Sequence, residues 1–141
     1  MPGRFPYKKL AKYPHMKPED VAVWERFIDN NPQFFDTCDY DVAVGEGAPQ
    51  SPELPENIQA DGKILTQKKI DVVAYQNNMI YLIEVKPICN MRAIGQILAY
   101  YDLYTKDHPG QSSPLKMIVC SSIERELEAT LSKYDIIVEV A

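Results

Sequence analysis

The sequence predicts an α/β fold in which a mixed β-sheet is covered by helices on both faces. Runs rich in β-branched residues follow one another in the middle of the chain and then alternate with segments of helical periodicity. Two of these runs, MIYLI and MIVC, are apolar throughout, as is typical of strands buried on both faces. With 141 residues, of which 45% are apolar and 25% charged, the composition fits one soluble domain with a single core.

The first part of the chain predicts an extended arm followed by a single domain. Residues 1–17 combine several prolines with five bases and no acid, and they lack any periodicity. We therefore expect a basic N-terminal arm, with residues 18–141 forming one domain. A helix is expected to start after Pro18 and to run to about Asn30, because Glu19 and Asp20 favour the positive end of a helix dipole and apolar residues then recur at helical spacing.

A strand, a long loop and a β-hairpin are expected next. Residues 35–44 alternate in polarity and predict a strand, whereas residues 45–63, rich in glycine, proline and acids, predict a loop. The runs KIDVVAY and MIYLIEVK surround Asn77-Asn78, and asparagine tolerates the positive φ angles that tight turns require. These two runs therefore predict the strands of a hairpin.

The remainder of the chain predicts helices that alternate with strands. A helical pattern extends from about Met91 to Thr105, and LKMIVC is typical of a buried strand. A second helix is expected over residues 123–134, IERELEATLSKY, and a last strand over DIIVEV. The predicted order of elements is therefore α-β-β-β-α-β-α-β.

Charge and cysteine content exclude several classes of protein. The net charge of −5 argues against a protein that coats nucleic acid by bulk attraction. The three cysteines are far apart, and together with two histidines they give no zinc spacing, so we expect buried free thiols.

No run approaches about 18 apolar residues, and the N-terminus lacks the apolar core of a signal peptide. We therefore expect a cytoplasmic protein that does not enter the membrane.

The predicted hairpin brings acidic and basic side chains together. With Asn77-Asn78 as the turn, Asp71 lies opposite Glu84, and Lys86 shares a face of its strand with Glu84. Facing carboxylates are costly unless a proton or cation neutralises them, and hard oxygen ligands suit Mg²⁺ or Mn²⁺. Glu-Val-Lys alone is more typical of an ion pair on an edge strand. The acid on the partner strand and the apolar surroundings favour a functional site instead.

These residues resemble the motif of the PD-(D/E)XK nuclease superfamily. The resemblance rests on Ile70-Asp71, on Ile83-Glu84-Val85-Lys86 and on Gly95-Gln96-Ile97-Leu98, and it covers roughly residues 19–141. Ile70 stands where the name-giving proline of the family would be, which is a common variation. The resemblance implies a restriction-endonuclease-like core, in which a mixed sheet follows the order α-β-β-β-α-β.

The resemblance also implies a role for each residue of the hairpin motif. Asp71 and Glu84 would hold the catalytic metal, Mg²⁺ or Mn²⁺, together with the carbonyl of Val85. Lys86 would orient or activate the attacking water, or stabilise charge in the transition state.

Two helices are implied to complete this site. Gln96 would support it from the helix that follows the hairpin. An acid on the first helix often belongs to such a site, and Glu25, next to the tryptophan, is the best match in this sequence. Asp29 is the alternative for the same role.

The implied activity is metal-dependent hydrolysis of DNA phosphodiester bonds. The helix and tail that follow the motif most resemble archaeal Holliday junction resolvases and mismatch-directed endonucleases, so we expect a structure-directed endonuclease acting on a junction, mismatch, flap or end. Basic side chains would contact DNA phosphates without reading the sequence. Contacts to nucleic acid are predicted at Lys8, Lys9, Lys12, Lys69, Arg92 and Tyr100. For Tyr100, packing in the core is the alternative.

Two other functions are open on the sequence alone. A protein of this fold could lack catalysis and bind nucleic acid or protein, although the intact acid pair and lysine argue against it. A sugar hydrolase could use the carboxylate pair, but the adjacent lysine and the lack of a tryptophan-rich groove count against it. A homodimer is also open, because a small nuclease that cuts both strands commonly needs two sites.

Overall fold

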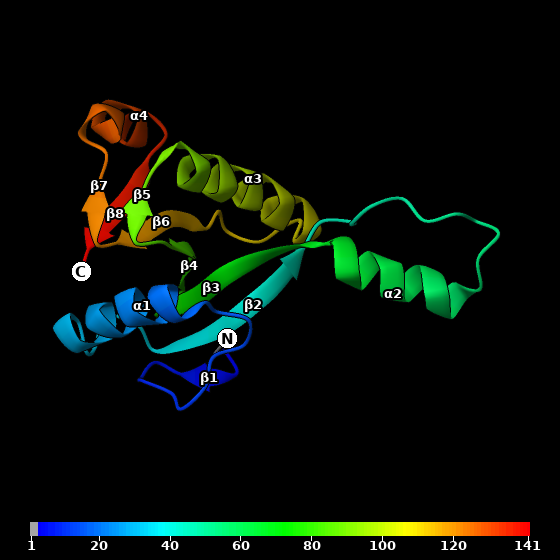
Figure 1. Cartoon of the computed structure of the whole chain (residues 1–141), viewed down its shortest axis with the longest axis horizontal. Helices are drawn as coiled ribbons and strands as arrows, with labels where there is room; N and C mark the ends of the chain where they lie inside the picture. Colours follow the sequence, from blue (N-terminus) through cyan, green and yellow to red (C-terminus); the bar gives the residue numbers. More distant parts are fainter. Residues whose placement is uncertain (1–2) are drawn as a thin grey trace.

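The computed structural model describes residues 3–141 and shows a six-stranded sheet with helices packed on both of its faces (Figure 1). Residues 1 and 2 of the N-terminal arm lie outside the described part of the chain. In chain order the elements are β1 (Phe5–Pro6), α1 (Pro18–Asn30), β2 (Thr37–Val44), α2 (Glu56–Thr66), β3 (Lys68–Gln76), β4 (Met79–Val85), β5 (Ile88–Cys89), α3 (Met91–Asp107), β6 (Leu115–Cys120), β7 (Ser122–Ile123), the 3-10 helix η1 (Arg125–Leu127), α4 (Glu128–Lys133) and β8 (Ile136–Val140).

The sheet combines an antiparallel half with a parallel half. Its strand order is β1-β2-β3-β4-β6-β8, and neighbouring strands are antiparallel from β1 to β4. Strands β4, β6 and β8 are parallel, because helical connections carry the chain back between them. The short strands β5 and β7 pair in a separate sheet. The predicted mixed α/β architecture is confirmed, with elements beyond those that the sequence predicted.

The β3–β4 hairpin has the predicted turn and register. Gln76 pairs with Met79 across Asn77-Asn78, and Asn77 adopts a φ of 56°. The same register continues along both strands. It brings Asp71 beside Glu84, so the hairpin itself positions the two acids.

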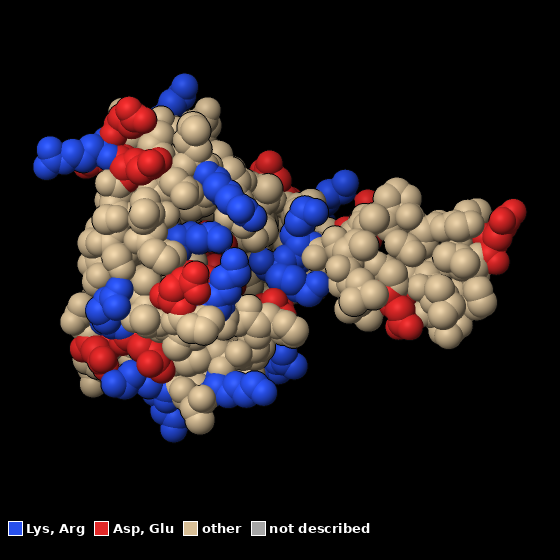
Figure 2. Space-filling model, viewed as in Figure 1, with Lys and Arg blue, Asp and Glu red and all other residues tan. Residues whose placement is uncertain are grey.

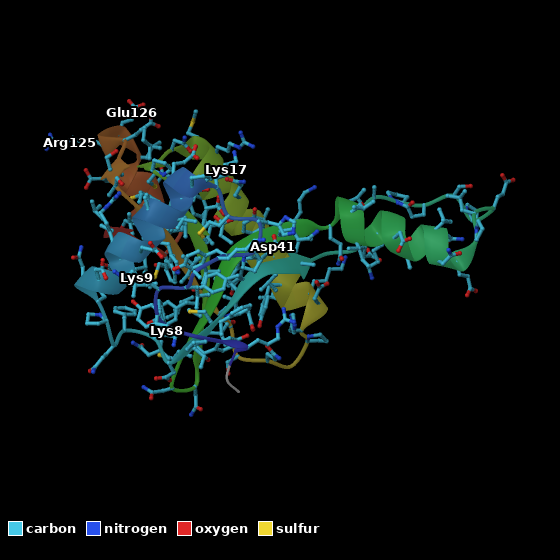
Figure 3. All side chains as sticks on the ribbon, turned by 60° about the horizontal axis from the view of Figure 1, so that its bottom comes forward. Lys8, Lys9, Lys17, Asp41, Arg125 and Glu126 are labelled. Atoms are coloured by element: carbon cyan, nitrogen blue, oxygen red, sulfur yellow. The ribbon has the colours of Figure 1, made fainter. Side chains whose placement is uncertain are left out.

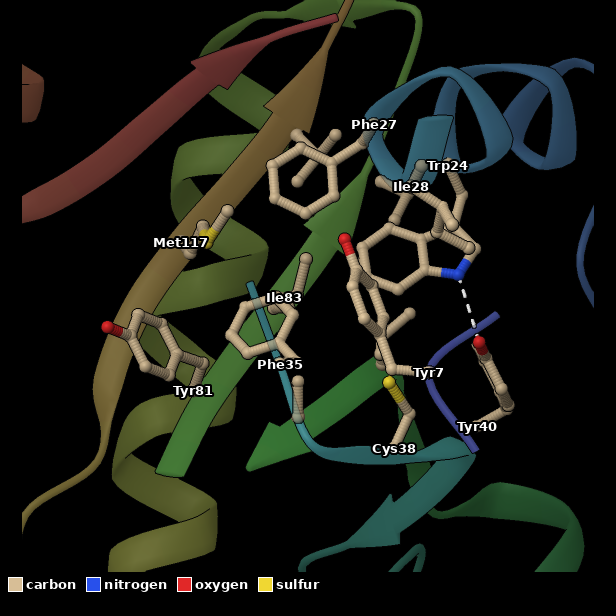
Figure 4. Packing of buried hydrophobic residues seen from close by; sticks show 14 of the residues in the cluster. Tyr7, Trp24, Phe27, Ile28, Phe35, Cys38, Tyr40, Tyr81, Ile83 and Met117 are labelled. Carbon is tan, nitrogen blue, oxygen red and sulfur yellow. Dashed lines mark hydrogen bonds between the residues drawn. The ribbon is translucent and has the colours of Figure 1, made fainter. Parts of the chain in front are cut away.

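Alternate residues of the central strands pack against α1 on one face and α3 on the other. On the α1 face, Trp24, Phe27, Tyr40 and Ile83 belong to one buried cluster (Figure 4). The indole nitrogen of Trp24 donates a hydrogen bond of 2.9 Å to the Tyr40 hydroxyl within this cluster. On the α3 face, Ile97 packs with apolar residues of β3, β4 and β6. Because both faces are covered, a carboxylate on these strands is largely removed from water.

The N-terminal arm packs against the sheet and α1. Phe5 pairs with Cys38 where β1 joins the edge of the sheet. Tyr7 and Tyr13 are buried in the α1 cluster, and the Tyr7 hydroxyl donates a hydrogen bond of 2.6 Å to the carbonyl of Asn31. The arm is therefore anchored through its aromatic side chains, while its lysines face outward.

The predicted loop over residues 45–63 is wrong in its second half, where α2 begins at Glu56. Helix α2 stands away from the rest of the molecule between β2 and β3 (Figure 1). Gly62 lies inside this helix, and a Cβ at that position would collide with the side chain of Gln50. A residue type that usually breaks helices is used here for close packing of two segments.

The helix predicted over residues 123–134 is wrong at its start. Ser122 and Ile123 pair with Ile88 and Cys89, so this segment is extended and forms β7. The helical part is reduced to η1 followed by α4. Pairing with a segment distant in sequence overrides the local helical pattern here.

The structure also bears on the expected buried thiols and on the expectation that the protein does not enter the membrane. All three cysteines are buried and free in the described part of the chain, as predicted. No helix within residues 3–141 is long and apolar enough to cross a membrane.

Candidate active site

Three charged side chains predicted for the site lie together at one end of the β3–β4 hairpin. The carboxylate of Asp71 accepts a hydrogen bond of 2.9 Å from the backbone N–H of Val85, which fixes it against the neighbouring strand. The ammonium of Lys86 lies 3.4 Å from Glu84 Oε2. The structure therefore brings Asp71, Glu84 and Lys86 together as the hairpin register requires.

The acid pair is closed off from solvent on its α3 side. Glu84 is only 1% exposed, and its Oε1 has no hydrogen-bond partner among the described residues. Gln96 Oε1 on α3 is likewise buried without a partner within residues 3–141. Buried polar atoms are seldom left unpaired, so these two oxygens indicate a site that accepts a donor or a cation.

The start of α3 determines which of its side chains reach the acid pair. The side chain of Asn90 accepts a hydrogen bond of 3.0 Å from the backbone N–H of Ala93 and thereby caps the helix. Gln96 and Tyr100 are four residues apart and share one face of α3. Burial raises the pKa of Tyr100, and the nearby charge of Glu84 adds to this shift. Tyr100 thus borders the acid pair as a buried residue.

Burial raises the pKa of both acids of the pair. For Glu84 burial is the largest cause, Asp71 adds to the shift and Lys86 opposes it. For Asp71 burial again dominates, and the hydrogen bond from Val85 opposes it. In the absence of a cation the pair therefore keeps a proton at pH values where free carboxyl groups are ionised.

The oxygens at this site fit the expected divalent cation. The unpaired Glu84 Oε1, the Asp71 carboxylate and the Val85 carbonyl are hard donors of the kind that Mg²⁺ and Mn²⁺ prefer. Within residues 3–141 no group of three or more His, Cys, Asp or Glu side chains is placed to hold a metal. Mg²⁺ commonly binds through only one or two carboxylates, with waters and substrate phosphates completing its shell. The oxygens present are therefore compatible with this ion.

A further acid, Asp20, faces the pair from the first turn of α1. Its side chain is buried, and burial is the largest cause that raises its pKa. The charge of Asp71 adds to this shift and that of Lys86 opposes it, which places Asp20 within electrostatic reach of both. From the sequence, Asp20 is predicted only to favour the helix dipole. An acid in a first turn gives no local signal that separates these two roles.

The two acids predicted on the first helix contact the N-terminal arm instead. Glu25 Oε2 accepts a hydrogen bond of 2.8 Å from the hydroxyl of Tyr13. Asp29 Oδ1 lies 3.0 Å from the ammonium of Lys9. Asp20, which lies earlier on the same helix, is the acid whose pKa responds to the charges of Asp71 and Lys86.

Asp41 lies on β2, which pairs with β3 on the side away from β4 (Figure 3). It adopts a φ of 54° and interrupts the β2–β3 ladder between the paired residues Tyr40 and Val42. Its charge contributes to the raised pKa of Asp71. The imidazole Nε2 of His15 lies 3.8 Å from Asp41 Oδ2. The strand pattern of the sequence gave no indication of this left-handed residue.

The predicted DNA contacts of the N-terminal arm are exposed side chains, of which Figure 3 labels Lys8 and Lys9. Lys8 and Lys12 are exposed, and Lys9 is exposed but paired with Asp29. The structure therefore leaves these lysines accessible to a polyanion.

Two other predicted contacts flank the acid pair more closely in the chain. Arg92 is exposed in the first turn of α3, and its charge acts on Tyr100. The ammonium of Lys69 donates a hydrogen bond of 2.8 Å to the carbonyl of Ile64, which ties it to the end of α2. Figure 2 shows Lys and Arg side chains gathered where α2 joins the rest of the molecule.

The fold resembles that of solved endonuclease structures. A repair endonuclease from Pyrococcus abyssi matches with a TM-score of 0.53 and 14% identity, over 93% of this chain and 49% of that chain. The EndoMS–dsDNA2 complex matches with a TM-score of 0.52 and 12% identity, over 94% of this chain and 48% of the other. A protein of unknown function, AF1548, matches with a TM-score of 0.50 and 15% identity, over 85% and 56% of the two chains.

These similarities concern the fold, because the sequence identities are low. No protein-family model and no curated protein matches this chain. The chain spans about half the length of the solved structures that it resembles, from 48% to 56%. The architecture is therefore an endonuclease-like α/β fold.

Proposed function

We propose that this chain is a metal-dependent DNA endonuclease of the PD-(D/E)XK type. The observation that carries the proposal is the pair of the buried Glu84 and the half-buried Asp71, which has a lysine ammonium 3.4 Å from Glu84 Oε2. Two acids that both resist ionisation are a poor ion-pair partner for Lys86 but a good receptor for a divalent cation. The similarity of the fold to repair endonucleases supports the same activity.

Each residue of the site would perform a separate task. Asp71, Glu84 and the Val85 carbonyl would hold the ion, as their oxygen donors allow. Bound there, Mg²⁺ or Mn²⁺ would polarise the scissile phosphate and lower the pKa of a water molecule. Lys86, held by Glu84, would stabilise negative charge that develops on the phosphate. Gln96 would accept a hydrogen bond from the attacking water through its unpaired Oε1.

The acid from the first helix is Asp20 in this proposal. Its burial and its electrostatic contact with Asp71 and Lys86 support this role. Glu25 is already engaged by the hydroxyl of Tyr13. Asp20 would help to neutralise Lys86 while the site binds its cation, and would thereby hold the ammonium in position.

DNA of unusual structure is the substrate class that we propose. EndoMS, which has a similar fold, is described in a complex with double-stranded DNA. Exposed bases such as Lys8, Lys12 and Arg92 would contact phosphates, and such contacts carry no sequence information. A domain of this size has too little surface to read a long sequence, so a junction, mismatch, flap or end is the expected target.

A cleavage assay on a panel of labelled DNA tests the proposed function. The panel contains linear duplex, single strand, four-way junction, mismatch and flap, each with Mg²⁺, Mn²⁺ or EDTA. We expect metal-dependent cleavage of at least one structured DNA, and a loss of about 100-fold or more in Lys86→Ala. Lys133→Ala, on α4, is the matched control for loss of one lysine. Binding of these DNAs without cleavage by the folded protein would instead identify a non-catalytic binding module.

A further inference from the structure

The segment between β2 and β3 carries apolar surface that the rest of the chain does not cover. We call residues 45–67, which include α2, the projection. In the part of the chain that the structure describes, α2 buries none of its side chains. Ile58 is 44% exposed, Ile64 58% and Leu65 82%, and Leu54 just before the helix is 40% exposed. A helix of this length is marginally stable in isolation, so a surface of this kind is typical of a docking element.

Hydrogen bonds at its base hold the projection in one conformation. The backbone N–H of Gly45 donates a bond of 2.8 Å to Asp107 on α3, and Gln67 Nε2 donates one of 2.7 Å to the carbonyl of Gly45. Further out, the N–H of Ala48 donates a bond of 2.7 Å to the hydroxyl of Thr66. The projection is therefore preorganised, which lowers the entropic cost of binding a partner.

The charge of the projection argues against DNA as its partner. It contains Glu46, Glu53, Glu56 and Asp61 against the single base Lys63. Acidic side chains lie along its outer part, whereas the basic side chains gather at its base (Figure 2). Phosphates would be repelled from the outer part of α2, so its partner must offer apolar and basic groups.

The chain itself contains a surface with these two properties. A groove of about 480 Å³ lies between the N-terminal arm and α1, and its lining includes the half-buried apolar residues Leu10, Met16 and Val21. The charged residues of its lining are Lys12 from the arm and Glu25 from α1, and Glu25 accepts a hydrogen bond from Tyr13. The described residues of the arm, 3–17, include no acid, so the groove adjoins a basic surface.

We propose that the projection docks into this groove on a second copy of the chain. Ile58 and Leu65 would contact the apolar lining, while the acids of α2 face the lysines of the partner's arm. A two-fold axis would make the contact reciprocal, so that each copy both gives a projection and receives one. A specific interface needs about 1,200 Å² of buried surface in total, and each of the two symmetric contacts would have to supply only about 600 Å². This dimer does not depend on the proposed nuclease activity.

Solution mass measured by light scattering over a series of concentrations tests the assembly. We expect a species of twice the chain mass of 16.1 kDa, and a shift to monomer in Leu65→Asp. Met91→Asp is the matched control, because Met91 is also apolar and 73% exposed but lies outside both surfaces. Circular dichroism of Leu65→Asp establishes that it is folded. A wild-type chain that stays monomeric, or a dimer unaffected by Leu65→Asp, would overturn the proposal.

Cross-linking identifies which surfaces meet. Ile58→Cys and Ala11→Cys place one thiol on the projection and one in the groove, and the three native thiols are buried. A bismaleimide should join the two variants when they are mixed and should leave Ile58→Cys alone uncoupled. Coupling of Ile58→Cys to itself would show that two projections pair with each other and would overturn docking in the groove.

The charges of the two surfaces provide an independent check. Lys12→Glu should raise the dissociation constant of the dimer by about 3- to 10-fold. The reason is that it replaces an attraction to the acids of the partner's α2 by a repulsion. Glu56→Lys in the same chain should recover most of this loss. An equal effect of Lys12→Glu with and without Glu56→Lys would argue that the two side chains do not face each other.

Discussion

Each acid of the pair carries a cost to the stability of the folded protein, because it is removed from water. Glu84 and Asp71 both lose hydration on burial, and for Glu84 the charge of Asp71 raises the pKa further. The same low-dielectric surroundings strengthen their interaction with any cation that enters. A site of this kind lowers the free energy of unfolding for the sake of function. Variants that replace one of the two acids by a neutral side chain should therefore be more stable.

The first prediction concerns the pH dependence of stability. The pKa of Glu84 is raised on folding, so the folded state keeps a proton that the unfolded state releases above its ordinary pKa of about 4.3. The free energy of unfolding therefore falls as pH rises through this range. In EDTA, Glu84→Gln should be more stable than the wild type at about pH 8, by on the order of 1–3 kcal/mol, and this advantage should shrink toward about pH 4.

Urea unfolding at a series of pH values measures this difference. Glu126→Gln, on the exposed 3-10 helix, is the control that removes one acid without removing a buried one. A Glu84→Gln protein that is less stable than the wild type at every pH would show that Glu84 is held as a stabilising ion-pair partner of Lys86.

The second prediction separates the two acids of the first helix. Asp20→Asn should lower kcat by about 10-fold or more, because the group that faces Asp71 and Lys86 loses its charge. Glu25→Gln should have a much smaller effect, since a glutamine oxygen can still accept the hydrogen bond from Tyr13. Rates on the best substrate of the cleavage panel measure both variants. A larger loss of kcat in Glu25→Gln than in Asp20→Asn would show that Glu25 is the acid of the first helix that serves the site, as the sequence predicts.

At the scale of elements, local signals predicted the chain best where structure is local. The β3–β4 hairpin could be predicted with its register, because Asn77-Asn78 and the β-branched runs around it determine the turn within a few residues. Helix α2 was missed because Pro55 and Gly62 suggested a loop, although one precedes the helix and the other packs against Gln50. Strand β7 was missed because its partner lies more than thirty residues earlier.

The residues of the candidate site also fall into two groups, those that a local pattern predicts and those that depend on tertiary packing. Asp71, Glu84 and Lys86 could be placed from sequence, since one hairpin carries all three. Asp20 and Asp41 reach the pair from α1 and β2, and their proximity depends on how these elements pack. No local pattern encodes that packing, so these two acids were visible only in the structure.

The third prediction tests whether the projection is independent of the core. Replacement of residues 46–66 by a short Gly-Ser linker should change the free energy of unfolding little, because α2 buries no side chain in the described structure. The reference is Leu65→Asp, since this variant should also lack the proposed dimer contact. Ile97→Ala on α3, a fully buried position, should instead cost about 2–5 kcal/mol. Urea unfolding of the three variants measures this contrast. A large loss on removal of the projection would mean that it stabilises the domain directly.

At the scale of the whole molecule, the acid pair lies in a chain about half as long as the structures it resembles. The sheet is covered on both faces, the N-terminal arm closes over α1, and the projection extends to one side (Figure 1). Five of the fifteen basic residues lie on the arm, and others gather at the base of the projection (Figure 2), within a chain of net charge −5. DNA binding should therefore be local and strongly dependent on salt.

We propose above all that Asp71 and Glu84 form a metal site for the hydrolysis of DNA. The most direct test is the rate of cleavage of the best DNA substrate as Mn²⁺ is titrated into wild type and Glu84→Gln, with EDTA as the blank. We predict saturable, Mn²⁺-dependent cleavage by the wild type and a loss of about 100-fold or more in the folded variant. Equal cleavage by the two proteins at every Mn²⁺ concentration would contradict the account.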